Sequence, residues 1–190
     1  MSDAIVIGGD ASGLAAATYL AKAGLKTVLL EKAEAIAAAG DPVLHALDPR
    51  VVKELKLGRH GLRFAFRDLS LVTLRAGAPP LTVPRDSRHP ARGVAALSPA
   101  DALALPAYRA ELFALARALR PMWWDGRPAS ETFAALKPTQ RALAERLSVT
   151  SALAFTSSWF ETDALRAALA FDALRAGFAP TEPGSALALA

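Results

Sequence analysis

The start of the chain alternates between apolar and alanine-rich stretches. Residues 4–7 are uniformly apolar, as expected of a parallel strand buried on both faces, and residues 26–30 carry a second apolar run. Alanines recur along residues 11–23 and are followed by Gly24, which predicts a helix that packs closely on a sheet and ends at this glycine. The order strand, helix, strand predicts a βαβ unit.

Weaker signals follow this unit. Residues 33–49 predict a helical turn and a loop, and residues 51–57 predict a short helix. Three segments have β-type composition and predict a small antiparallel meander, at residues 62–67, 70–75 and 81–83. We therefore expect residues 1–93 to form one portion of the fold, with the meander inserted into it.

Helical patterns dominate residues 94–190. Ser98, followed by a proline and by an acid three positions on, predicts the start of a helix. Pro106 is expected to divide this region into a short helix and a longer one that reaches about Arg120, because proline removes a helical hydrogen bond. Further helices are expected to begin near Ser130, Thr139, Ser151 and Thr162. The whole chain is predicted to have an α/β fold with a helical C-terminal portion.

A glycine-rich turn joins the first strand to the first helix. Its sequence is Gly8-Gly9-Asp10-Ala11-Ser12-Gly13, in which Asp10 occupies the second glycine position of the pattern G-x-G-x-x-G. A helix N-terminus offers unpaired N–H groups and partial positive charge to a pyrophosphate, and glycines keep side chains out of its path. The turn therefore predicts a Rossmann-type dinucleotide-binding fold.

An acidic residue completes this pattern. Glu31 ends the second strand 18 residues after Gly13, close to the position expected for an acid that binds the adenosine ribose. Asp10 opposes binding, because a carboxylate about 5 Å from a phosphate would cost about 3 kcal/mol at an effective dielectric near 20, or about two orders of magnitude in affinity. The predicted cofactor-binding residues are Gly8, Gly9, Asp10, Ala11, Ser12, Gly13, Leu14, Glu31 and Lys32.

Composition excludes several classes of protein. The chain has no cysteine, which excludes thiol catalysis, disulfide redox chemistry and cysteine-ligated metals within these residues. Its three histidines lack the spacing of a classical metal site, so we expect no metal. No uncharged apolar run is long enough to span a membrane, and no signal-peptide pattern is visible, so we expect a cytoplasmic protein.

Positive charge is concentrated in one part of the chain. Residues 48–92 include ten basic and four acidic residues, whereas the net charge of the whole chain is +4. The simplest interpretation is a solvated basic face. The alternative is a surface for a phosphate-bearing cofactor, an acidic partner or peripheral contact with an anionic membrane. We expect no nucleic-acid partner, because no nucleic-acid-binding module accompanies the charge.

Two aromatic pairs stand out in the helical portion. They are Trp123-Trp124 and Trp159-Phe160. Aromatic side chains of this kind are expected to pack in the core or at helix ends. The alternative is a wall for an apolar substrate or for a partner subunit.

Several segments together resemble FAD-dependent oxidoreductases related to phytoene desaturases, within the amine oxidase superfamily. The similar segments are residues 3–17 with Glu31, Arg59-His60-Gly61-Leu62, and residues 81–84, 98–101, 106–108, 159–166 and 183–185. They cover nearly the whole chain but only the N-terminal portion of a usual family member. The resemblance implies a Rossmann-type FAD-binding fold, incomplete relative to the full two-domain flavoprotein, and hydride transfer from an apolar or amine substrate.

The chain departs from this family at three points. Asp10 replaces a glycine, and Ala37-Ala38-Ala39 stands where the family usually has a glycine pair. The C-terminal half of the family, which supplies much of the substrate domain, has no counterpart here. No catalytic acid or base can be named from the sequence.

Two functional hypotheses follow from the sequence. The first is the N-terminal subunit or fragment of a split FAD-dependent oxidoreductase, completed by a second protein chain or by another copy of itself in a homo-oligomer. The second, motivated by Asp10 and the three alanines, is a cofactor-free subunit with a structural or assembly role. A third, an autonomous NAD-binding module, is disfavoured because only one βαβ unit is readable.

Overall fold

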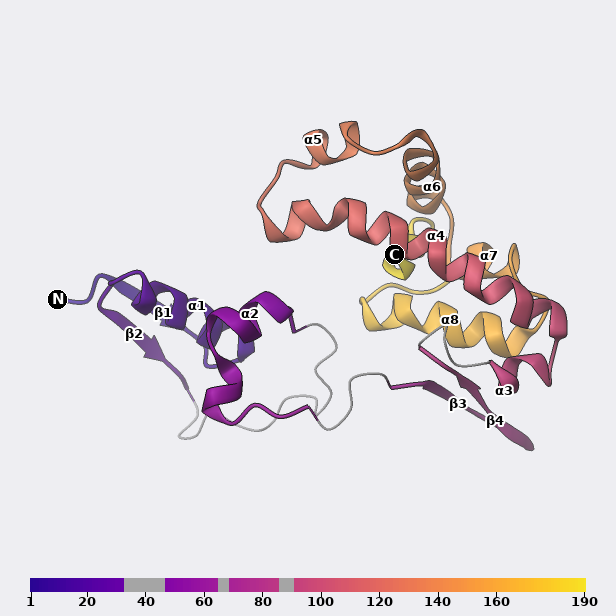
Figure 1. Ribbon diagram of the computed structural model, residues 1–190, viewed down its shortest axis with the longest axis horizontal. Helices are drawn as coiled ribbons and strands as arrows, with labels where there is room; N and C mark the ends of the chain where they lie inside the picture. The colour runs from indigo at the N-terminus through magenta and orange to yellow at the C-terminus, as the bar shows by residue number, and fades with distance from the viewer. Residues whose placement is uncertain (33–46, 65–68, 86–90) are drawn as a thin grey trace. The chain divides into compact units, whose positions relative to one another are not determined.

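The computed structural model describes residues 1–32, 47–64, 69–85 and 91–190. The chain divides into two compact units, Met1–Ala65 and Phe66–Ala190, here called the N-terminal unit and the C-terminal unit. Each unit has a small two-stranded sheet, and the C-terminal unit is mainly helical (Figure 1). The predicted α/β fold with a helical C-terminal part is therefore confirmed.

The N-terminal unit is built on a βαβ arrangement. Strand β1 (Ala4–Ile7) pairs in parallel with β2 (Thr27–Leu30), with Ala4 opposite Thr27 and Ile7 opposite Leu30. Helix α1 (Ala11–Lys22) connects the strands, and Gly24 adopts a positive φ of 90° just after it, where a residue with a Cβ would be strained. This is the unit that the apolar and alanine-rich pattern predicted.

A short helix continues the N-terminal unit. Helix α2 (Pro49–Glu54) is capped by Asp48 and leads into the 3-10 helix η1 (Leu57–His60). Two hydrogen bonds fasten it to α1: the Tyr19 hydroxyl donates to Glu54 Oε2 at 2.7 Å, and Lys22 Nζ donates to the Glu54 carbonyl at 2.7 Å. The short helix expected at residues 51–57 is present as α2, which begins two residues earlier and ends at Glu54. The helical turn expected after residue 33 lies mostly outside the described residues.

The C-terminal unit begins with a hairpin. Strands β3 (Leu71–Arg75) and β4 (Ala78–Val83) are antiparallel, and helix α3 (Arg92–Ala95) packs closely on β4. In the first predicted β segment, residues 62–64 are not a strand, and residues 65–67 lie outside the described residues. Leu81 and Val83 are buried in the helical core. The hairpin therefore belongs to the C-terminal unit, and the compact units divide well before the boundary that we placed after residue 93.

A single long helix organises the C-terminal unit. Helix α4 (Pro99–Trp124) runs without a break through Pro106 and Pro121. The prediction that Pro106 would divide it was wrong. An internal proline costs about 3 kcal/mol, but α4 buries a row of residues on both sides of Pro106, which outweighs that cost: Leu105, Tyr108, Leu112, Leu115 and Leu119.

Shorter helices surround α4. They are α5 (Ala129–Ala134), α6 (Pro138–Val149), α7 (Ala152–Ser157), α8 (Asp163–Arg175) and the terminal 3-10 helix η2 (Ser185–Leu189). Each of the four predicted start positions lies within one residue of a helix start. Tyr108 of α4 stands at the centre, with its ring 5.0 Å from that of Phe160 and 5.7 Å from that of Trp159. Burial raises the pKa of the Tyr108 phenol well above its usual value.

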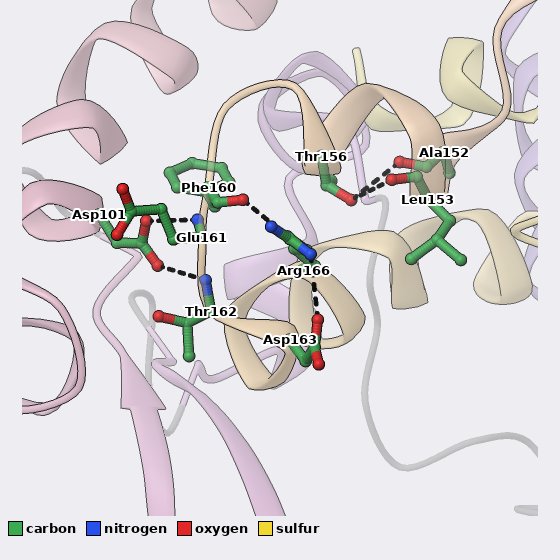
Figure 2. Close-up of polar contacts among 9 residues, drawn as sticks. All are labelled: Asp101, Ala152, Leu153, Thr156, Phe160, Glu161, Thr162, Asp163 and Arg166. Atoms are coloured by element: carbon green, nitrogen blue, oxygen red, sulfur yellow. Dashed lines mark hydrogen bonds and ion pairs between the residues drawn. The ribbon is translucent and has the colours of Figure 1, made fainter.

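A buried carboxylate ties α4 to the start of α8. Asp101 is 1% exposed, and its two oxygens accept the backbone N–H groups of Glu161 at 2.8 Å and Thr162 at 3.0 Å (Figure 2). Arg166 of α8 holds the segment just before α8 as well, since its Nε donates to the Phe160 carbonyl at 2.6 Å. The backbone of residues 160–162 is therefore held by side chains from two helices. The sequence indicated only that Ser98 would cap α4, which it does, accepting the Asp101 N–H at 3.1 Å.

The aromatic pairs have different environments. Phe160 is buried and Trp159 packs against the same core, as predicted. Trp123 and Trp124 lie at the end of α4, one of the two expected positions, but both are exposed and lie outside the core. Arg120 lies over the Trp124 ring at 5.6 Å from its centroid, which gives this exposed pair a cation–π contact.

Candidate dinucleotide-binding site

The turn between β1 and α1 is built by its glycines. The Gly8 N–H donates to the Leu30 carbonyl at 2.9 Å, and Gly8 has a positive φ of 104° that redirects the chain into α1. Gly13 passes so close to this turn that a Cβ built on it would lie 2.0 Å from the Gly8 carbonyl oxygen. The first and last glycines of the pattern are therefore required by the backbone itself, one for its dihedral angle and one for close packing.

Asp10 caps the helix that the turn opens. Its backbone is extended, with φ −70° and ψ 177°, and its carboxylate accepts the N–H of Gly13 at 2.7 Å. An aspartate at a helix N-cap satisfies one of the unpaired donors of the first turn. The negative charge predicted to oppose a pyrophosphate is thus aimed at the helix N-terminus, and it already occupies one N–H group there.

Glu31 lies beside the turn rather than away from it. Since β1 and β2 are parallel and in register, their carboxyl ends meet at one edge of the sheet, and the Glu31 carboxylate accepts the N–H of the buried Gly9. The same carboxylate accepts its neighbour's N–H, that of Lys32, at 2.7 Å. The structure therefore brings the predicted ribose-binding acid and the glycine turn together.

The remaining predicted residues line the first turn of α1. The Leu14 N–H donates to the Asp10 carbonyl at 2.9 Å. The described residues offer no hydrogen-bond partner to the N–H groups of Ala11 and Ser12, which stand at the first two positions of the helix. These two exposed donors are available to an anion, as expected of a helix N-terminus.

The site fits a dinucleotide in most respects. The glycine turn, the two available N–H groups and a carboxylate at the end of β2 are the parts that such a ligand needs at the carboxyl edge of parallel strands. The Glu31 carboxylate, which accepts the Gly9 and Lys32 N–H groups, is an acceptor of the kind that binds ribose hydroxyls. Among the described residues of the site, Asp10 is the one that does not fit, because its carboxylate brings negative charge to the position expected for the pyrophosphate.

Other predicted features contribute less. Ala37-Ala38-Ala39 lies outside the described residues. Within the described parts of the chain, no group of three or more His, Asp or Glu side chains could hold a metal ion. No described helix combines the length and the apolar character that crossing a membrane requires.

Comparisons with known proteins agree with this geometry. Residues 6–48 match the family of NAD(P)-binding Rossmann-like domains. The chain is also 27% identical to pyridine nucleotide-disulfide oxidoreductase domain-containing protein 2 of Rattus norvegicus and 28% identical to the protein of that name from Mus musculus. Both alignments cover 98% of this chain.

The chain spans only 40% of the length of these two relatives. No solved structure matches it significantly. The matches identify a dinucleotide-binding Rossmann-like domain at the N-terminus and extend the similarity through the helical unit. They support a dinucleotide-binding oxidoreductase family, and they do not single out the phytoene desaturases.

Proposed function

We propose that this chain is the dinucleotide-binding part of an FAD-dependent oxidoreductase that resembles phytoene desaturases and is completed by further polypeptide. The observation that carries the proposal is the contact between Glu31 and Gly9, because it holds the carboxylate predicted to bind ribose beside a glycine turn at a helix N-terminus. The names of the two relatives, which refer to an oxidoreductase domain, support the same class.

Each residue of the site has a proposed role. The N–H groups of Ala11 and Ser12 would bind the pyrophosphate, and the positive end of the α1 dipole would favour its charge. Glu31 would accept the hydroxyls of the adenosine ribose. Gly8 supplies the positive φ that the turn needs, and Gly13 allows α1 to pack closely against the turn.

Redox chemistry in this chain requires a bound group. The chain has no cysteine, so the disulfide in the relatives' name has no counterpart in residues 1–190. When bound, a flavin accepts hydride from an apolar or amine substrate, and the protein supplies position and electrostatics. The partner polypeptide would supply the surfaces that enclose substrate and flavin ring.

A reduction experiment tests this function. The chain is purified together with the polypeptide that completes it, and the visible spectrum is followed under anaerobic conditions as apolar amines and polyenes are added. Bleaching of the oxidised flavin bands by one of these substrate classes is the expected result. A flavin that is present but is reduced by neither class would contradict the assignment to hydride transfer from such substrates.

Asp10 favours one alternative function. Its carboxylate accepts the Gly13 N–H and brings negative charge to the helix N-terminus, where the pyrophosphate is expected to bind. A chain that kept this fold without binding a cofactor would serve as a structural or assembly subunit of a larger complex. A colourless complex would support this alternative, particularly if Asp10→Gly then gave the complex flavin that it had lacked.

A further inference from the structure

Within its described residues, the N-terminal unit leaves one face of its sheet uncovered. Side chains on the face toward α1, including Val6 and Leu29, are partly buried. On the opposite face Ile5 is 62%, Ile7 84%, Val28 39% and Leu30 50% exposed. Ile5 lies opposite Val28 and Ile7 opposite Leu30, so the four side chains form one continuous apolar surface, here called the open face.

The outer edge of β1 is also unpaired within the described residues. Ala4 and Gly8 donate their N–H groups to the carbonyls of Lys26 and Leu30. Because alternate residues of a strand direct their backbone groups to opposite edges, Ile5 and Ile7 direct theirs away from β2. Among the described residues β1 pairs with β2 alone, so this edge offers the hydrogen-bonding groups that another strand needs.

The described part of this unit has almost no buried core. Leu55, at 8% exposure, is the one buried hydrophobic residue in the described part of residues 1–65, whereas the C-terminal unit has an extensive buried cluster. A two-stranded sheet is marginal without further strands, and parallel sheets are normally covered on both faces. Ile5 and Ile7 of β1 therefore belong both to the open face and to the unpaired edge.

We propose that the open face and the free edge of β1 form the docking site for a strand and a following helix from the polypeptide that completes the relatives. This inference rests on the proposed function for the existence of that polypeptide. More than half of each relative lies outside the match. In a doubly wound sheet the first strand is central, with a further parallel strand on the side away from the second strand and helices on both faces.

A second copy of this chain fits the surface less well. Two copies joined through β1 by a twofold axis would pair these strands antiparallel. Both α1 helices would then lie on one side of the joined sheet, and both open faces would remain uncovered on the other. The geometry therefore favours a different polypeptide segment over self-association.

Photochemical cross-linking tests the docking site in the full chain. A photoreactive phenylalanine derivative replaces Ile5 in cells that make the protein at its natural level, and the cross-linked peptides are identified by mass spectrometry. The expected peptides come from a polypeptide that aligns with the part of the relatives beyond the match. Cross-links to a second copy, to residues 66–190 of the same chain or to an unrelated protein would overturn the proposal, as would the absence of any cross-link.

A matched pair of variants provides a second measurement. Ile5→Lys places a charge in the proposed interface and should reduce the co-purified polypeptide at least about tenfold. Val149→Lys alters another β-branched residue, 72% exposed at the end of α6, and should leave the yield unchanged. Strand addition should also slow hydrogen exchange at the Ile5 and Ile7 amides, and unchanged exchange there in a formed complex would contradict it.

These results separate the docking site from the proposed function. A cross-link from position 5 in a colourless complex would support the docking site and contradict the flavin assignment. A flavin-containing complex without that cross-link would do the reverse.

Discussion

The Asp10 carboxylate accepts the backbone N–H of Gly13 at 2.7 Å. Through this contact Asp10, which departs from the glycine pattern, is the N-cap of α1. The same carboxylate therefore stabilises the helix and adds negative charge where an anionic ligand would bind. The two effects can be separated, because Asn caps a helix about as well as Asp does, and Gly is weaker by only a few tenths of a kcal/mol.

Asp10→Asn should raise the affinity of the assembled protein for FAD by up to about a hundredfold, because it removes about 3 kcal/mol of repulsion while keeping the cap. Equilibrium titration with FAD, followed by flavin fluorescence, measures the effect. Asp3→Asn makes the same charge change at the opposite end of β1, where Asp3 accepts the Lys26 N–H, and serves as the control. Equal affinities for Asp10→Asn and the unmodified protein would show that the pyrophosphate lies elsewhere.

Glu31→Gln should weaken FAD binding by about ten- to a hundredfold, since a charged hydrogen bond contributes about 1.5–3 kcal/mol. Glutamine keeps one oxygen for the Gly9 N–H, so the turn should persist. Glu54→Gln, which changes the acceptor of the Tyr19 hydroxyl in the same unit, is the matched control. The ribose assignment fails if both variants bind FAD as the unmodified protein does.

Gly13→Ala should disrupt the turn and abolish FAD binding. The added Cβ would lie 2.0 Å from the Gly8 carbonyl oxygen, and a backbone atom cannot move aside cheaply. Gly58→Ala is the control, because a Cβ there meets no heavy atom within 4 Å. Faster hydrogen exchange in β1 and α1 of the first variant alone is expected. Unaltered exchange and binding would contradict the role given to close packing.

Asp101→Asn should destabilise the C-terminal unit by about 2–4 kcal/mol at neutral pH, because one of the two N–H groups that the buried carboxylate accepts would face an amide donor. Burial alone would raise the pKa of Asp101, but hydrogen bonds from Thr162 and Glu161 outweigh it and hold the pKa below its usual value. The carboxylate therefore stabilises the fold above the unfolded-state pKa of about 3.9. This contribution is lost as the pH falls through the lower pKa of the folded state.

Urea unfolding of both proteins across the acidic range measures this dependence. The difference in unfolding free energy between the unmodified protein and Asp101→Asn should be constant near neutrality and shrink below about pH 4. Ser98→Ala, which removes only the N-cap of α4, should cost about 1 kcal/mol. A difference that grows on acidification would contradict the lowered pKa.

The sequence predicted the parts of the fold that depend on local patterns. The βαβ unit followed from two apolar runs, spaced alanines and a glycine turn, all within residues 4–31. The N-cap role of Asp10 was also readable in principle, since Asp directly precedes a predicted helix. The glycine pattern by itself indicates only the effect of its charge, whereas the cap depends on the geometry of the turn.

Other features depend on contacts between distant residues. The Asp101 carboxylate meets backbone groups about sixty positions away, and nothing in its local sequence distinguishes it from an acid in a capping motif. Likewise, α4 continues through Pro106 because of side chains that it buries against other helices. The exposure of Trp123 and Trp124 was not readable either, because aromatic composition does not say which face of a helix is covered.

The FAD content of the assembled protein tests the central claim most directly. The chain and its completing polypeptide are purified together without added cofactor and denatured, and the released FAD is quantified against protein. We predict close to one FAD for each copy of this chain, and a loss of FAD with Glu31→Gln. A stable complex that releases no FAD, and takes up none even as Asp10→Asn, would contradict a dinucleotide-binding role for the turn at Gly8–Gly13.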